Sequence, residues 1–301
     1  MDKEYGIGIC AEHPFYTVEE IFAHSSKTVR GFVEKNYSKK MHSQAFYEIN
    51  IVLRGKATHY IEKGSMAVEQ GDVFIIPPNI MHGYDGGEGF DVYHILVSPK
   101  FLEKYSASLQ LLNSFASLFK IDPLMRARAS AKLHFRLTQK DLDSISSRFK
   151  TLTVRSYEQG SVDTLVSEGE VLIIISELCD IYDRTVRSLS ATESEDSLFI
   201  ASISHIYRHY NEKITVDILA GIAHMSRTSY IEKFKRVLGC PPARFIRCHK
   251  VEMITQMLTD TSMSEAEIAC AVGCSDVSHL IKIFTADRGV SPSKYRKNLI
   301  K

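Results

Sequence analysis

The sequence predicts an α+β protein: a small N-terminal β-barrel, a helical segment after it, and a C-terminal domain made only of helices. Three observations support this prediction. Short runs with period-two alternation, broken by Gly, Pro and Asn, extend from about Thr17 to Val97. Apolar residues at three- and four-residue steps, typical of helices, dominate from Pro99 to about Ser190. An internal repeat occupies the segment from Leu198 to Arg296.

Length and composition restrict the class of protein. With 301 residues and a mean hydropathy of -0.10, the chain is long enough for two domains with separate cores. It has no run of the roughly eighteen apolar residues that span a bilayer, and its start, MDKEYGIGIC, lacks the layout of a signal peptide. The six cysteines show no CxxC spacing, so we predict no zinc site. We expect a reduced, cytoplasmic protein without a membrane segment.

The charge is distributed unevenly along the chain. Residues 195–301 contain 15 basic and 11 acidic residues, a net charge of +4, whereas the rest contains 22 basic and 25 acidic residues, a net charge of -3. A positive C-terminal half is suited to contact with nucleic acid phosphates. Because the excess is modest, the prediction of DNA binding depends on the motif in this half.

The internal repeat has an offset of 49 to 50 residues. Repeats near this length usually consist of one supersecondary unit used more than once. The matched positions are Leu219-Ala220 with Ile268-Ala269, and Phe234, Gly239, Pro242 and Phe245 with Phe284, Gly289, Pro292 and Tyr295.

The first copy predicts two short helices around a tight turn. Thr215 and Ser226 are the predicted N-caps of the two helices, and Gly239 ends the second because glycine adopts left-handed backbone at little cost. The second helix has an apolar stripe for burial, formed by Tyr230, Phe234 and Val237.

The second copy predicts the same arrangement. Ser264 and Glu267 form a capping box, Gly273 makes the turn, and Ser275 starts the second helix. We expect this helix to be buried through Leu280, Ile283 and Phe284 and to end at Gly289 and Pro292. Two helices around a tight turn, the second with a polar outer face, form a helix-turn-helix, whose second helix can lie in the DNA major groove.

Three segments resemble the AraC/XylS family of bacterial transcription regulators: IYRHYNEKITVDILAGIAHMS, FKRVLGCPPARFI and VGCSDVSHLIKIFTADRGVSPSKYR. The resemblance implies that a long helix, about Pro242 to Leu258, joins the two motifs. It also implies that their recognition helices enter successive major-groove segments on one face of double-stranded DNA. The sequence departs from the family at Lys250-Val251, where Arg-Leu is usual, at Gly273-Cys274, where Gly-Phe is usual, and at His279-Leu280, where an aromatic pair is common.

The outward faces of the two recognition helices supply the predicted DNA contacts. The family places base-reading residues where this chain has Thr228, Ile231 and Glu232, and we assign Arg227 and Lys235 to phosphates. In the second copy the outward residues are Val277, Ser278, Ile281 and Lys282. The alternative interpretation is that the charged side chains on these helices are only solvated.

The N-terminal barrel resembles the cupin family. Gly71, Pro77, Asn79 and His82 follow the spacing of its second motif, with Asn79 in place of a glycine. His42, Gln44, Glu48 and Gly55 resemble the first motif of the cupin family, with Gln44 in place of its second histidine. Cupin-like domains are common sensor halves of AraC-type regulators, so the resemblance implies a ligand-binding domain.

Histidine and carboxylate side chains that converge in a barrel indicate a binding site. The predicted ligand-binding residues are His42, Glu48, Tyr60, His82 and His94. Such a set holds iron, manganese or zinc in some proteins, but one motif histidine is missing here. We therefore predict a pocket for an organic effector, without a metal or other cofactor. A third interpretation is that these residues only maintain the fold.

Three helices are predicted between the barrel and the repeat, at Phe101–Phe119, Asp141–Val154 and Thr164–Val186. The last has Leu165, Leu172, Ile175, Cys179 and Tyr182 along one side. This stripe covers the sheet or forms a homodimer seam. The predicted domains are residues 1–100, a ligand-binding barrel, 101–189, a dimerisation segment, and 195–301, a DNA-binding domain, with an acidic linker at Leu189–Asp196.

These patterns predict a sequence-specific transcription regulator whose N-terminal domain senses a small molecule, dimerises, or both. The partners implied are double-stranded DNA, RNA polymerase, an unidentified effector and a second copy of the chain. We predict that the protein is not an enzyme. The alternative is a metal-dependent cupin enzyme, which the incomplete ligand set and the lack of a recognisable acid/base pair disfavour. A further alternative is a module whose helix pairs bind RNA polymerase or another protein.

Overall fold

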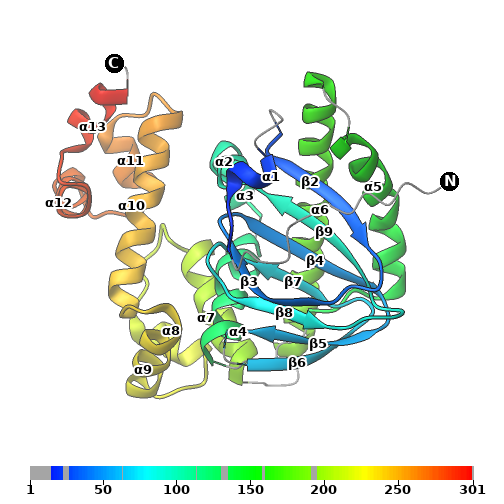
Figure 1. Cartoon of the computed structure of the whole chain (residues 1–301). Helices are drawn as coiled ribbons and strands as arrows, with labels where there is room; N and C mark the ends of the chain where they lie inside the picture. Colours follow the sequence, from blue (N-terminus) through cyan, green and yellow to red (C-terminus); the bar gives the residue numbers. More distant parts are fainter. Residues whose placement is uncertain are drawn as a thin grey trace. The chain divides into compact units, whose positions relative to one another are not determined.

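The computed structural model describes residues 15–22, 27–62, 64–112, 114–129, 135–157, 160–190 and 195–299 (Figure 1). The chain divides into two compact units, residues 1–188 and 189–301. Among the described residues, no helix combines the length and apolar character that a membrane crossing requires.

The first unit contains two β-sheets whose strands follow the orders β1-β3-β8-β5-β6 and β2-β9-β4-β7. Only the β1 and β3 pair is parallel among the strand pairs described. The α+β prediction with an N-terminal cupin-type β domain is confirmed, although the two sheets do not close into a continuous barrel. The strands are β1 (Phe15–Tyr16), β2 (Val29–Glu34), β3 (Lys39–Gln44), β4 (Tyr47–Arg54), β5 (Lys56–Ile61), β6 (Gly64–Glu69), β7 (Val73–Ile76), β8 (His82–Asp85) and β9 (Asp91–Val97).

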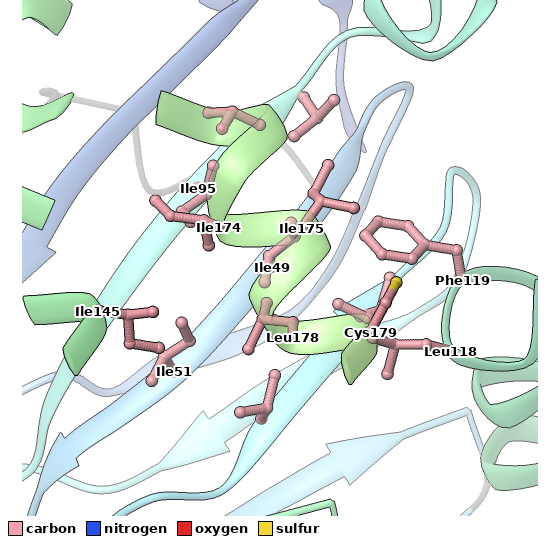
Figure 2. Packing of buried hydrophobic residues seen from close by; sticks show 14 of the residues in the cluster. Ile49, Ile51, Ile95, Leu118, Phe119, Ile145, Ile174, Ile175, Leu178 and Cys179 are labelled. Atoms are coloured by element: carbon pink, nitrogen blue, oxygen red, sulfur yellow. The ribbon is translucent and has the colours of Figure 1, made fainter. Parts of the chain in front are cut away.

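Helices cover one face of the smaller sheet. Ile49 and Ile51 of β4 alternate toward this face, as the period of two requires, and pack beneath Ile174 and Leu178 of α6 (Figure 2). Burial of this apolar surface is the main contribution to the stability of the unit. The helices of the unit are α1 (Val18–Phe22), α2 (Pro99–Lys104), α3 (Ser106–Gln110), the π-helical turn η1 (Ser117–Ile121), α4 (Asp122–Ala129), α5 (Gln139–Tyr157) and α6 (Ser161–Ser190).

The structure corrects two predictions for this helical region. The single helix predicted over Phe101–Phe119 is divided into α2, α3 and η1, although its apolar residues enter one core cluster. Leu165, predicted to share one side of α6 with Ile175, Cys179 and Tyr182, is 67% exposed, whereas those three residues are buried. The predicted acidic linker overlaps the end of α6 and the start of α7, and residues 191–194 within it lie outside the described residues.

The second unit is all helical in its described residues, and each predicted helix-turn-helix is present. The first consists of α8 and α9 and the second of α11 and α12, with α10 between them. Thr215, Ser226 and Ser264 accept the capping hydrogen bonds predicted for them. The helices are α7 (Glu195–Arg208), α8 (Val216–Ile222), α9 (Arg227–Leu238), α10 (Pro242–Asp260), α11 (Glu265–Ala271), α12 (Val277–Arg288) and α13 (Pro292–Leu299).

The second turn is tighter than the sequence alone reveals. Gly273 has a φ of 63°, and a Cβ there would lie 1.9 Å from the carbonyl oxygen of Asn211, so only glycine fits. The following helix begins at Val277, two residues after the predicted start at Ser275, and its N-cap is Asp276, which accepts from the amide of His279. Ile283 is half-buried on this helix, whereas Leu280 and Phe284 are fully buried.

Candidate ligand pocket and DNA-binding helices

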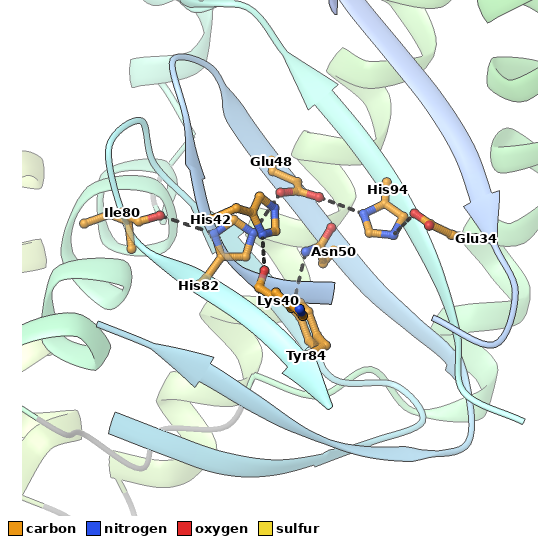
Figure 3. A network of polar contacts seen from close by, with 9 residues as sticks. All are labelled: Glu34, Lys40, His42, Glu48, Asn50, Ile80, His82, Tyr84 and His94. Atoms are coloured by element: carbon orange, nitrogen blue, oxygen red, sulfur yellow. Dashed lines mark hydrogen bonds and ion pairs between the residues drawn. The ribbon is translucent and has the colours of Figure 1, made fainter. Parts of the chain in front are cut away.

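A buried carboxylate, Glu48, lies at the centre of a polar cluster in the first unit (Figure 3). Its Oε2 is 3.1 Å from Nε2 of His82, and its Oε1 is 2.7 Å from Nδ1 of His94. His42 lies beside His82, with ring centroids 4.2 Å apart. The cluster draws these residues from β3, β4, β8 and β9 and therefore from both sheets. Of the five predicted ligand-binding residues, the structure brings four together: His42, Glu48, His82 and His94.

Backbone carbonyls fix which ring nitrogens carry protons. Nδ1 of His42 is 2.9 Å from the carbonyl oxygen of Lys40, and Nδ1 of His82 is 3.2 Å from that of Ile80. A carbonyl oxygen can only accept, so both Nδ1 atoms donate. Nε2 of His42 is therefore free to present a lone pair, whereas Nε2 of His82 donates to the carboxylate of Glu48. Backbone bonds of this kind orient histidines that bind metals.

The protonation states follow from burial and from the neighbours. Burial, reinforced by the charge of His82, lowers the pKa of His42 from 6.5 to about 4, so its ring is neutral at pH 7. Burial alone would raise the pKa of Glu48. The hydrogen bonds and charges of His82 and His94 outweigh that effect and hold this pKa well below its usual value. Glu48 is therefore an anion that needs positive partners.

The cluster borders a small cavity of about 40 Å³. Both polar atoms of the Gln44 side chain line this cavity region without a hydrogen-bond partner among the described residues, although Gln44 is only 1% exposed. Buried amides are normally paired, so this side chain is available to a bound group. The cavity is lined by Tyr16, Ile21, Phe32, Glu34, Tyr37, Lys39, His42, Gln44, Phe46, Glu48, His94 and Leu96.

The donor set also fits a metal ion. One ligand atom each from His42, Glu48 and His82 lie within 4.8 Å of one another, and all three residues are buried. Two imidazole nitrogens and a carboxylate suit a divalent first-row transition metal. Chemically the cluster can hold a cation or hydrogen-bond a small polar molecule.

Tyr60 is not part of the pocket. Its side chain is 39% exposed, and its neighbour His59 on β5 points inward and is fully buried. Alternation along a strand places adjacent residues on opposite faces, so Tyr60 faces away from the buried side of the sheet, and neither residue lines the cavity. His59 stacks on Tyr84 at 4.3 Å, and neither of its ring nitrogens has a hydrogen-bond partner in the part of the chain that the structure describes. The alternation of Ala57, His59 and Ile61 along β5 is the sequence pattern that predicts His59, and not Tyr60, on the inward face.

The recognition helix of the first motif is α9. Tyr230, Phe234 and Val237 are buried, and the predicted contact residues lie on the remaining surface. Arg227, Thr228, Glu232 and Lys235 are exposed, and Ile231 is half-buried. Arg227 is not free, because its Nη1 lies 2.7 Å from both carboxylate oxygens of Asp217 on α8. DNA phosphate must compete with this pair for the guanidinium.

The recognition helix of the second motif is α12. Ser278, Ile281 and Lys282 are exposed, whereas Val277 is half-buried and packs against the core of the unit. Val277 therefore offers less surface to a base than the sequence suggested.

Lys250 accounts for one departure from the family pattern. Its Nζ donates to the carbonyl oxygens of Val272 at 2.9 Å and Gly273 at 3.2 Å. A cation at the C-terminal end of α11 is favourable for the helix dipole. Lysine thus supports the second turn from the linker helix.

Comparison with known proteins agrees with this architecture. A family described as the AraC-like ligand binding domain matches residues 30–202, and a helix-turn-helix domain family matches residues 219–298. The HTH-type transcriptional activator RhaR of Mannheimia succiniciproducens is 23% identical over 265 residues, which are 87% of this chain and 88% of that protein. The uncharacterised HTH-type transcriptional regulator YdeC of Bacillus subtilis is 24% identical over 82% of each chain.

Similar solved structures include the DNA-binding domain of AdpA in complex with a target DNA. It is 25% identical, with a TM-score of 0.33, and the match covers 34% of this chain and 91% of that one. An apo variant of ToxT from Vibrio cholerae is 14% identical, with a TM-score of 0.35, and the match covers 91% of this chain and 99% of that one.

Two helix-turn-helix motifs after a ligand-binding β domain define a DNA-binding transcription regulator. The chain belongs to the AraC family of such regulators, because the AraC-like ligand-binding family matches more than half of its length.

The His42 environment predicts a dependence of stability on pH. The folded pKa lies below the unfolded value, so His42 contributes stability above pH 6.5 that is lost as pH falls from 6.5 to about 4. The loss is up to about 3 kcal/mol. Urea unfolding of wild type and His42→Gln, with a chelator present, would measure it. We expect the free energy of unfolding of the variant to fall less steeply over this range. Parallel curves for the two proteins would contradict the assignment.

Proposed function

We propose that this regulator binds operators through both recognition helices and that an effector in the Glu48 pocket controls its affinity for DNA. In this proposal, residues 1–100 bind the effector, 101–189 form a homodimer, and 195–301 bind DNA in the cytoplasm and contact RNA polymerase. The observation that carries it is a pair of capped helix-turn-helix units, each with an exposed face on its second helix. An effector would act by binding one arrangement of the protein more tightly than another.

The proposed DNA contacts divide by chemistry. Thr228, Ile231 and Glu232 read bases in the first half-site, and Glu232 is suited to accept from cytosine N4. Ser278, Ile281 and Lys282 contact the second half-site, where Ile281 packs against a thymine methyl group. Arg227 and Lys235 contact phosphates. The half-buried Val277 is the remaining proposed DNA contact.

DNA selection with the full chain tests this assignment. At roughly 0.15 M salt with excess competitor, we expect two enriched sequence blocks about 10 bp apart. Lys282→Ala should weaken binding to the enriched duplex by about tenfold at low salt, and the difference should shrink as salt rises. Lys140→Ala, an exposed change on α5, is the control. Equal affinity of Lys282→Ala and wild type at low salt would exclude the contact.

The homodimer proposal rests on α6. Its face opposite the sheet carries Val162, Leu165 and Ile173, which are 66%, 67% and 41% exposed. Gly169, between them in helical register, has open space where a Cβ would lie. Apolar residues in such a row on a helix exposed to water are suited to pairing with the same row of a second copy.

Replacing Leu165 should disrupt this pairing. We expect Leu165→Glu to sediment as a monomer at concentrations at which wild type is a dimer, because a charge would be buried in the seam. Leu111→Glu is the matched control, since Leu111 is 83% exposed elsewhere on the same unit. A monomeric wild type, or a dimer unaffected by Leu165→Glu, would rule out this interface.

A second candidate is that the sensed molecule is a divalent metal ion, contrary to the metal-free pocket that the sequence predicted. The supporting observation is the convergence of His42, Glu48 and His82 with both Nδ1 atoms committed to carbonyls. A bound ion would supply positive charge for Glu48 and a site for a polar effector. Membership of a family of regulators favours this sensing role over the metal-dependent enzyme.

Elemental analysis and thermal unfolding test the metal proposal. Wild type dialysed against zinc, manganese or iron should retain about one ion per chain and unfold at a higher temperature than the chelated protein. His82→Gln should lose both effects, whereas His209→Gln, a change at a half-buried position in the second unit, should keep them. Equal metal content in all three proteins would reject the site.

A further inference from the structure

Lys233 is a buried cation on the recognition helix α9. It is 5% exposed and lies on the same buried side as Tyr230, Phe234 and Val237. The repeat offset of 50 residues matches Lys233 with Ile283 of α12, just as it matches Phe234 with Phe284. The first motif therefore has a charge at a position that the second fills with an apolar residue.

Two carboxylates and one aromatic ring near the start of α7 stabilise the charge of Lys233. Nζ of Lys233 donates to Oε1 of Glu195 at 2.8 Å and to Oδ1 of Asp196 at 2.9 Å. The same Nζ lies 5.1 Å from the ring centroid of Phe199. All three partners belong to the first turns of α7.

The position of α7 makes these contacts important. Its first residue, Glu195, stands where the chain coming from the first unit enters the helices of the second. The first turn of a helix unwinds more easily than its middle, because its backbone amides lack intrahelical hydrogen-bond partners. The contacts of Lys233 with Glu195 and Asp196 thus connect the start of α7 to α9, the first recognition helix.

An ion pair at this position depends on both partners staying in place, which an apolar contact does not. Breaking a buried pair leaves an uncompensated charge, which is costly, whereas replacing it with apolar residues is often neutral or stabilising. A lysine is therefore not required for packing here, since isoleucine serves at the equivalent position. Glu195 and Asp196 both stand in the first turn of α7, so the charge of Lys233 is compensated only while that turn is folded.

We propose that Lys233 is a positioning residue that couples the start of α7 to the DNA-binding state of α9. This inference rests on the proposed operator binding. When the entering chain holds the first turn of α7 folded, the lysine stays buried and α9 keeps its binding position. When that turn unwinds, Lys233 loses both carboxylates and α9 is released, which lowers affinity at the first half-site.

Hydrogen exchange on the full chain measures this coupling without a known effector, because coupling between two sites is reciprocal. In wild type, the duplex enriched by selection should slow exchange of amides in α9 and also in residues 197–203 of α7, by about fivefold or more. A duplex of scrambled sequence is the reference.

Two variants separate coupling from simple packing. Lys233→Ile copies the residue of the second repeat, so we expect it to fold and bind the enriched duplex. It should retain slowed exchange in α9 and lose the response of α7. The double variant Glu195→Gln, Asp196→Asn leaves the lysine uncompensated, and should bind the enriched duplex about tenfold or more weakly. Glu265→Gln, which removes a carboxylate from the first turn of α11, is the control and should behave as wild type.

The outcomes distinguish this inference from the proposed function. Slowed exchange in α9 with the same α7 response in wild type and Lys233→Ile would overturn the coupling alone. Exchange in α9 that does not distinguish the enriched from the scrambled duplex would overturn sequence-specific binding and the coupling together. Loss of the α7 response in Lys233→Ile, with α9 still responsive, would establish Lys233 as the link.

Discussion

The buried carboxylate of Glu48 is the constraint on which the first unit depends. It belongs to β4 of the smaller sheet, and it accepts a hydrogen bond from His82 of β8 in the larger sheet. An anion buried without partners costs several kcal/mol, so the larger sheet must approach closely enough to supply His82, while His94 comes from the adjacent strand β9 of the same sheet. The same contact leaves His42 and Gln44 facing the cavity. One requirement of electrostatics thus fixes the packing of the sheets and creates the polar end of the pocket.

Features that depend on neighbouring residues could be predicted from the sequence. The caps at Thr215, Ser226 and Ser264 and the end at Gly239 followed from side chains within one or two turns of each helix. The repeat then defined the fold of the second unit, because equivalent positions face equivalent cores. The convergence of His42, Glu48 and His82 could be predicted because their types and spacing resemble the two cupin motifs.

Features set by tertiary contacts could not be predicted. The apolar residues from Phe101 to Phe119 have the spacing of one helix, but the segment forms α2, α3 and η1 and buries them in one core. The choice between His59 and Tyr60 depends on strand register, and a one-residue error exchanges the two faces. The partners of Lys233 are nearly forty residues away in sequence, so its burial appears only when α7 and α9 are placed together.

The length of α6 has a mechanical consequence. A helix of 30 residues is about 45 Å long at the standard rise of 1.5 Å per residue. A continuous helix moves as a rod, so a tilt of about 5° at one end displaces the other by about 4 Å. Because α6 packs on the sheet that contains Glu48 and ends at Ser190, one continuous helix links that sheet to the point from which the chain continues.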